Sequence, residues 1–162
     1  MQIGDDIFLY DVTGDHSGEH HYYVSPLPNE YGFSHGLRTE AIMGELTDGP
    51  QNITPDHFKQ NAVFVSFLGS IIAKHASQCP GLVAEIKRQQ NGVVCILDRR
   101  TPAPDDAVPP EDIIGGVEIQ NSQILQFHGS PHYQVFTKDG FMQLDGWLRE
   151  RLVEELIALS DE

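Results

Sequence analysis

The run from Gly32 to Gly36 reads G-F-S-H-G and matches G-x-S-x-G, the pattern around the nucleophilic serine of many hydrolases. That chemistry needs a strand that delivers the serine onto a strained turn, and a helix that follows the turn. The residues just before the run, 28–31, are not typical of a buried strand. We therefore expect an ordinary glycine-rich loop over Pro26–Gly36, and a small hydrolase that uses Ser34 is the alternative.

Eight histidines raise the question of a metal site. A first group gathers potential ligands within seven residues, and a second pair is spaced by four: Asp15, His16, Glu19, His20 and His21, then His128 and His132. A protein zinc site needs three or four ligands that converge at about 2 Å from the ion. Glycine and proline residues interrupt both histidine spacings, so neither lies on a convincing helix. We expect loop and edge-strand histidines without a metal, and a hydrolase with a histidine-bound metal stays as an alternative.

Two arginines, Arg99 and Arg100, follow the continuous apolar run Val93–Leu97 and Asp98. Paired arginines suit a carboxylate or phosphate at the carboxyl end of a central strand. Acidic neighbours make surface ion pairs the simpler interpretation. A small-anion binder centred on the two arginines is a further alternative.

The net charge is −14, and it is unevenly distributed. Residues 1–54 carry nine acidic side chains and one basic side chain, residues 55–100 carry three and six, and residues 101–162 carry twelve and three. An acidic surface repels phosphate backbones and anionic lipids, so we expect neither nucleic acid nor a membrane as partner. The same charge favours a partner protein with a basic surface, or simply keeps the protein soluble.

Aromatic side chains are frequent in the acidic N-terminal third, where tyrosine offers a large contact area with a polar tip. If the strands alternate, Tyr22 and Tyr23 lie on opposite faces of a sheet. The candidate binding residues of the whole chain are Tyr22, Tyr31, Phe33, His35, Arg99 and Arg100.

No catalytic constellation has the context that its chemistry needs, so we expect a non-enzymatic protein-interaction module that binds a basic partner protein. An inhibitor, an immunity-type protein and an adaptor all fit this description. We expect no cofactor. Cys79 and Cys95 are too few for a disulfide framework, and no secretory signal opens the chain, so the expected location is the cytoplasm.

A helix is expected from Pro55 to about Ala76, with Thr54 as N-cap and with Ile53 and Phe58 as a hydrophobic staple. Its run Ala62–Ala73 is apolar on nearly all faces, which predicts a largely buried helix and makes a homodimer possible.

The other elements follow from periodicity and turn chemistry. Strands are expected at Ile7–Tyr10, His21–Val24, Val93–Leu97, Val117–Ile119, Ile124–Phe127, Tyr133–Thr137 and Phe141–Leu144. A short helix is expected over Arg38–Leu46, a second helix from Pro80, a proline-rich loop over Thr101–Pro110, and a C-terminal amphipathic helix capped by Asp145. The prediction is one α+β domain over residues 1–162, with an antiparallel or mixed sheet of about six strands against the central helix.

Overall fold

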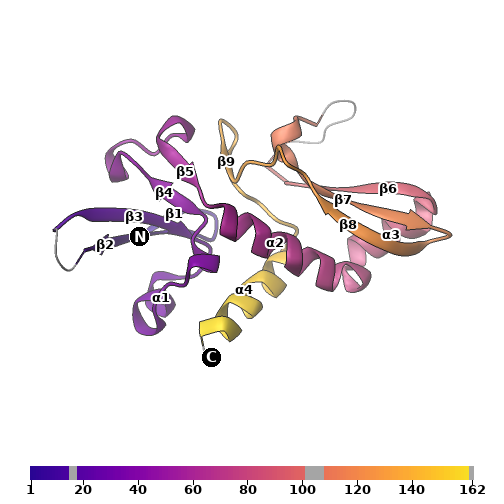
Figure 1. Ribbon diagram of the computed structural model, residues 1–162, viewed down its shortest axis with the longest axis horizontal. Helices are drawn as coiled ribbons and strands as arrows, with labels where there is room; N and C mark the ends of the chain where they lie inside the picture. Colours follow the sequence, from indigo (N-terminus) through magenta and orange to yellow (C-terminus); the bar gives the residue numbers. More distant parts are fainter. Residues whose placement is uncertain (15–17, 101–107, 161–162) are drawn as a thin grey trace. The chain divides into compact units, whose positions relative to one another are not determined.

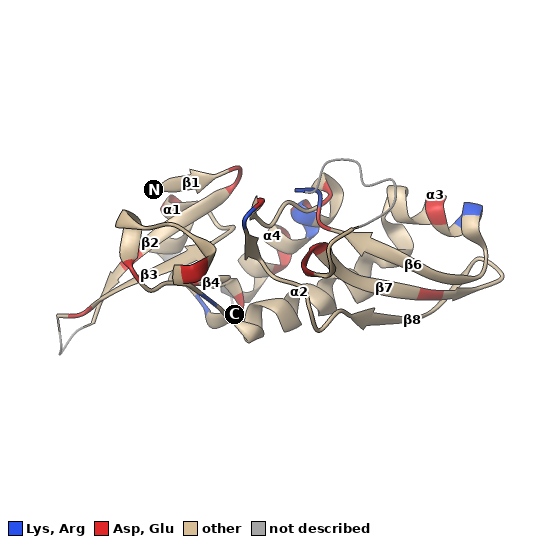
Figure 2. Ribbon diagram, turned by 90° about the horizontal axis from the view of Figure 1, so that it is seen from above, with Lys and Arg blue, Asp and Glu red and all other residues tan. Residues whose placement is uncertain are grey.

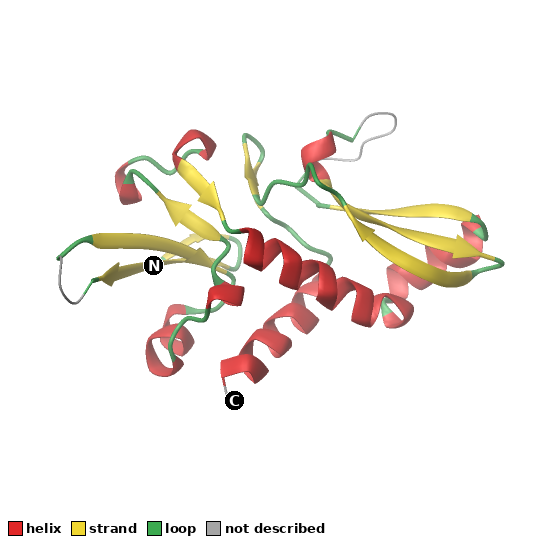
Figure 3. Cartoon of the chain, in the orientation of Figure 1, coloured by secondary structure: helices red, strands yellow, loops and turns green. Residues whose placement is uncertain are grey.

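The computed structural model describes residues 1–14, 18–100 and 108–160, and within them the chain is α+β, as predicted (Figure 1). Four α-helices accompany antiparallel sheets of five, three and two strands in this described part (Figure 3). The expected single sheet of about six strands is therefore wrong. None of the described helices is long and apolar enough to cross a membrane.

The chain divides into two compact units, each assembled from separate segments. Unit 1 consists of Met1–Phe67, Val135–Phe141 and Val153–Glu162, and unit 2 consists of Leu68–Gln134 and Met142–Leu152. The single domain over residues 1–162 stays a prediction.

Unit 1 contains the five-stranded sheet, in which every strand pairs with its neighbour in the sequence. Its strands are β1 (Gln2–Gly4), β2 (Ile7–Thr13), β3 (His20–Ser25), β4 (Gly44–Leu46) and β5 (Phe58–Gln60). The strands predicted at Ile7–Tyr10 and His21–Val24 are confirmed, and β2 and β3 pair as an antiparallel hairpin in an unbroken register from Phe8↔Ser25 to Thr13↔His20. The residues 15–17 of its turn lie outside the described part.

A two-stranded hairpin, β9 (Phe136–Thr137) and β10 (Gly140–Phe141), also belongs to unit 1. The rings of Phe136 and Phe141 stack at 3.9 Å, and the Phe58 ring meets both edge-on. This contact explains why the helix predicted from Pro55 is wrong. Residues Pro55–His57 form one 3-10 turn, Phe58 enters β5 instead of a staple, and α2 (Ala62–His75) begins later.

Thr54, the expected N-cap of that helix, has a different hydrogen-bond partner. The Thr54 hydroxyl donates to the Asn52 side chain and caps no helix. Helix α2 itself is amphipathic rather than largely buried, because it buries Phe64, Leu68, Ile71 and Ile72 while Val63 is 44% exposed. That spacing of three and four residues places the buried side chains on one face.

Two other segments of unit 1 also differ from the prediction. Residues Asn29–His35 form helix α1 instead of an irregular loop. Residues Thr39–Ala41 form a single 3-10 turn that is followed by β4, where a short helix was expected, because β4 pairs with both β3 and β5.

Unit 2 contains the three-stranded sheet β6 (Gly92–Leu97), β7 (Ile113–Gln120) and β8 (Gln123–Gly129), in that order, and helix α3 (Pro80–Gln89) contacts β6. Val94, Ile96, Val117 and Ile119 are buried. Gly115 is required by a close approach, since a Cβ there would lie 2.5 Å from the His128 carbonyl oxygen. The predicted strands at 93–97, 117–119 and 124–127 are confirmed.

The closing helix α4 (Gly146–Ser160) has the predicted cap. One carboxylate oxygen of Asp145 accepts hydrogen bonds from the backbone N–H groups of Trp147 and Leu148, at 3.1 and 3.3 Å. Leu148, Leu152 and Leu156 are buried along one stripe of this helix.

Candidate functional site

One face of the unit 1 sheet gathers aromatic and polar side chains. The register pairs Tyr10 with Tyr23, Val12 with His21, and Tyr23 with Glu45. Residues directly opposite each other on neighbouring strands share a face, as do residues two apart on one strand. These five residues therefore form one surface, which we call the aromatic face.

Tyr22 lies on the opposite side of the same sheet, as the alternation predicted. A Cβ on Gly49 would lie 3.1 Å from the Tyr22 ring, and Tyr22 is half-buried. The two adjacent tyrosines cannot serve one binding surface.

Helix α1 covers part of the aromatic face. The Tyr10 hydroxyl donates to the carbonyl oxygens of Leu27 and Pro28, both at 2.7 Å. A Cβ on Gly32 would lie 2.4 Å from Tyr10, so only glycine fits this contact. The Phe33 ring packs 5.2 Å from the Tyr10 ring and is nevertheless 66% exposed. Phe33 therefore extends the aromatic face as an exposed hydrophobic side chain.

A hollow of about 320 Å³ adjoins Tyr23 on this face. Thr39, Ile42, Glu45, Lys59 and Asn61 contribute to its lining. The imidazole of His21 lies parallel to the Tyr23 ring at 5.8 Å, and its Nδ1 lies 3.1 Å from a carboxylate oxygen of Glu45. The aromatic face thus joins exposed apolar area to groups that can form hydrogen bonds.

The acidic charge of the chain is concentrated in unit 1. The segments of unit 1 contain fifteen acidic and three basic residues, a net charge of −12, whereas those of unit 2 contain nine and seven, a net charge of −2. Figure 2 colours the acidic and basic residues of the described part. Every described carboxylate side chain of unit 1 is exposed or half-buried. The surface of unit 1 is therefore strongly anionic.

The other predicted residues of this unit have different surroundings. The Tyr31 hydroxyl donates to the carbonyl oxygen of Ile157 at 3.1 Å, which ties α1 to the C-terminal part of α4. His35 is the last residue of α1. Ser34 lies within the same helix, where its hydroxyl donates to the Glu30 carbonyl oxygen at 2.8 Å. The turn between a strand and a helix that a nucleophilic serine requires does not occur at this position.

Besides His21, two described histidines lie near carboxylates. His20 lies 2.8 Å from Asp11, and His128 lies 3.2 Å from Glu118. Within residues 1–14, 18–100 and 108–160, no three or more His, Cys, Asp or Glu side chains gather as metal ligands would. Asp15 and His16 lie outside the described residues.

The two predicted arginines are not brought together. The Arg99 side chain is exposed and forms an ion pair with Asp145 at 2.8 Å. The Arg100 side chain is buried, with its Nε 2.7 Å from Asp112 and 3.7 Å from Asp98. Arg100 also donates to the carbonyl oxygens of Glu111 and Gln134. A guanidinium already enclosed by carboxylates is a poor receptor for a small anion.

Sequence reasoning missed the residue that completes this buried cluster, Tyr133. Its hydroxyl donates to Asp98 at 2.7 Å. Burial, followed by the charge of Asp98 and this hydrogen bond, raises the pKa of Tyr133 well above its usual value. The two-residue period of the strand could have predicted the burial of Arg100, since residues 94, 96, 98 and 100 are buried and the residues between them are exposed or half-buried.

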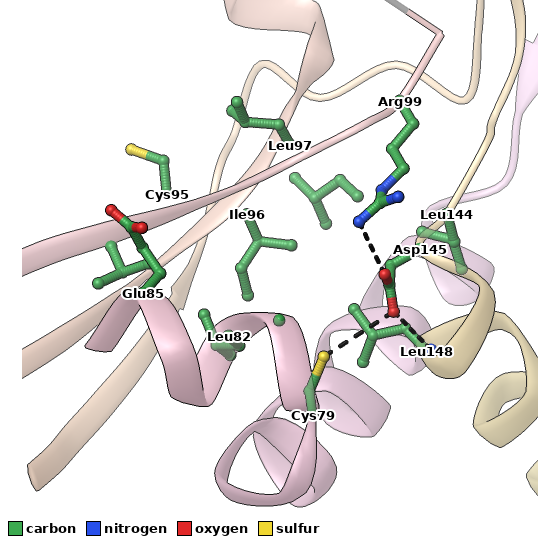
Figure 4. A pocket seen from close by; sticks show the side chains of 13 residues that line it. Cys79, Leu82, Glu85, Cys95, Ile96, Leu97, Arg99, Leu144, Asp145 and Leu148 are labelled. Carbon is green, nitrogen blue, oxygen red and sulfur yellow. Dashed lines mark hydrogen bonds and ion pairs between the residues drawn. The ribbon is translucent and has the colours of Figure 1, made fainter. Parts of the chain in front are cut away.

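A separate pocket of about 180 Å³ lies in unit 2 between α3 and β6 (Figure 4). Its lining is more apolar than polar. Leu82, Ile96 and Leu148 contribute apolar side chains to the lining, and Glu85 and the Arg99–Asp145 ion pair contribute polar groups (Figure 4). Neither the serine nor the histidines discussed above line this pocket.

Comparison with known proteins finds no family model, no curated protein and no solved structure that matches the chain.

Proposed function

We propose that the protein is a non-enzymatic interaction module whose unit 1 binds a partner protein with a basic surface, as an inhibitor, an immunity-type protein or an adaptor does. The observation that carries this proposal is the charge of −12 on unit 1 against −2 on unit 2. A surface of one sign attracts a partner of the opposite sign over a distance of several ångströms and raises the association rate.

The aromatic face gives this surface a point of close contact. Phe33 is 66% exposed and Val12 is 38% exposed, and Tyr23 lies beside the hollow. Aromatic side chains are enriched at protein interfaces and dominate their binding energy, while the charged rim directs the encounter. Tyr23 and Phe33 are thus the expected contact residues, with the surrounding carboxylates steering the partner.

The surroundings of the reactive side chains also favour binding over catalysis. Ser34 is engaged with its own helix, and Arg100 is enclosed by carboxylates. The proposal includes a cytoplasmic location, where the free thiols of Cys79 and Cys95 remain reduced.

The test uses charge reversal on either unit. The partner is first captured from native lysate with the wild-type protein, identified by mass spectrometry and purified. Its association rate is then measured with Asp5→Lys/Asp48→Lys in unit 1 and with Glu118→Lys/Glu150→Lys in unit 2. All four side chains are exposed, and the two variants change the net charge equally.

We expect the unit 1 variant to slow association about tenfold and the unit 2 variant to change it less than about twofold. Circular dichroism of both variants should match the wild type, because exposed charges contribute little to stability. Equal effects of the two variants, or no effect of the unit 1 variant, would refute binding through unit 1.

A further inference from the structure

Among the residues that the structure describes, strand β6 forms one edge of its sheet and no strand pairs with its outer side. In the described part of unit 2 the strand order is β6-β7-β8, so β7 pairs with only one side of β6. The backbone N–H of Asp98 donates toward β7, to the Asp112 carbonyl oxygen at 2.8 Å. The next residue, Arg99, donates in the other direction, to the Gln143 carbonyl oxygen at 2.8 Å.

The alternation of the strand identifies the groups at this open edge. Backbone groups of successive residues point to opposite sides of a strand. Those of Leu97 and Cys95 therefore point away from β7, as those of Arg99 do. Val93 has the same orientation, and its carbonyl oxygen accepts a hydrogen bond from the Gln89 side chain of α3 at 2.9 Å. Gln89 and Gln143 thus close the two ends of the edge, and Cys95 and Leu97 lie between them.

The pocket of unit 2 lies along this same stretch. Four consecutive β6 residues, 94–97, line it together with residues of α3 and α4 (Figure 4). A residue paired opposite Ile96 would share its inward face and point toward Leu82 and Leu148. Unpaired strand edges are usually blunted by lysine, proline or a covering segment, but β6 contains neither lysine nor proline.

The outer edge of β6 and the pocket of unit 2 together form what we call the groove. We propose that the groove binds an extended peptide segment of a partner protein, which pairs with the edge of β6 and inserts one aliphatic side chain between α3 and α4. Backbone pairing supplies affinity in such strand addition, and the pocket supplies the side-chain preference. The two charged side chains that line the pocket are already paired within unit 2, Glu85 with Arg88 and Arg99 with Asp145, so the preference is for an uncharged aliphatic side chain. This site rests on unit 2 and is independent of the anionic surface of unit 1.

In an antiparallel peptide, in keeping with the rest of the sheet, the residue before the inserted side chain lies opposite Leu97 and the residue after it lies opposite Cys95. The probe is a fluorescent peptide with the sequence acetyl-Thr-Val-Glu-Leu-Lys-Val-Thr-amide, in which leucine pairs opposite Ile96 and the two charged residues keep the peptide soluble. The matched probe carries N-methyl groups on the glutamate and lysine amides, which removes the donors for Leu97 and Cys95 but keeps every side chain.

Two glycine variants of the whole protein complete the test. Gly81 lines the groove and Gly146 does not. A Cβ at either position would meet nothing within 4 Å, so both positions accept a side chain. Gly81→Leu fills the groove and Gly146→Leu is the control. The wild type and Gly146→Leu should bind the unmodified peptide with a Kd below about 1 mM, and Gly81→Leu and the N-methyl peptide should weaken binding at least about tenfold.

Three results would overturn the proposal. The wild type could fail to bind the unmodified peptide, or the N-methyl peptide could bind equally well, or Gly81→Leu could leave binding intact. A fourth result, a concentration-dependent dimer in sedimentation that Gly81→Leu abolishes, would assign the groove to a second copy of this chain instead. None of these results changes the expected effect of charge reversal on unit 1, so the two proposals fail separately.

Discussion

Two tyrosines have environments that oppose ionisation. Tyr10 is 1% exposed, and its burial raises the pKa to about 12 even though a backbone hydrogen bond at Gly32 acts in the other direction. Burial and Asp98 raise the pKa of Tyr133 in the same sense. A phenolate at Tyr10 would face the Leu27 and Pro28 carbonyl oxygens without a proton between them.

These shifts predict a loss of stability in alkaline solution. Below about pH 10 the tyrosine is protonated in both the folded and the unfolded chain, so it contributes no pH dependence. Between about pH 10 and 12 the unfolded chain releases its proton first, and the free energy of unfolding falls. In urea denaturation at several pH values, Tyr10→Phe should show a shallower fall than the wild type over this range. Identical slopes would contradict the assigned environment of Tyr10.

Single residues also show where sequence reasoning stops. The sequence places Arg99 and Arg100 directly after a strand, and the structure confirms strand β6 there. The expectation that this strand is central is wrong, because β6 is an edge strand of the described sheet and Val93 is 53% exposed. The sequence also suggested surface ion pairs for both arginines. The partners of Arg100 include Asp112 and the Gln134 carbonyl oxygen, 12 and 34 residues further along the chain. Local composition cannot reveal contacts that only the folded sheet creates.

At the scale of elements, predictions that depended on neighbouring residues were confirmed, and those decided by distant partners were wrong. The β2–β3 hairpin, strand β6 and the Asp145 cap rely on periodicity and turn chemistry. The helix expected from Pro55 had good local signals, but Phe58 packs against Phe136 and Phe141, about eighty residues further along the chain. Tertiary packing overrides local propensity in such segments.

Helix α2 provides a test of its one-sided burial. Leu68 is 1% exposed and Val63 is 44% exposed. Leu68→Ala should lower the free energy of unfolding by about 2–5 kcal/mol, because it removes buried methyl groups and leaves a cavity. Val63→Ala should change it by less than about 1 kcal/mol. Equal losses in urea denaturation would mean that the helix is buried on both faces.

At the scale of the whole molecule, the fold shows which unit carries the net negative charge, and the three sequence segments alone did not show this. The acidic C-terminal portion, residues 101–162, is divided between the two units, and unit 1 is assembled from three separate segments. Only the fold shows that nearly all of the net charge belongs to unit 1. The aromatic face lies on that same unit, so one partner can meet both features.

The salt dependence of partner association tests this central claim most directly. The Debye length shortens from about 10 Å at 0.1 M to about 3 Å at 1 M ionic strength, so long-range steering largely disappears over this range. The association rate of the purified partner should fall steeply with salt for the wild type and for Glu118→Lys/Glu150→Lys. It should fall less steeply for Asp5→Lys/Asp48→Lys, in which the steering surface is weakened. An association rate of the wild type that does not depend on salt would contradict the account.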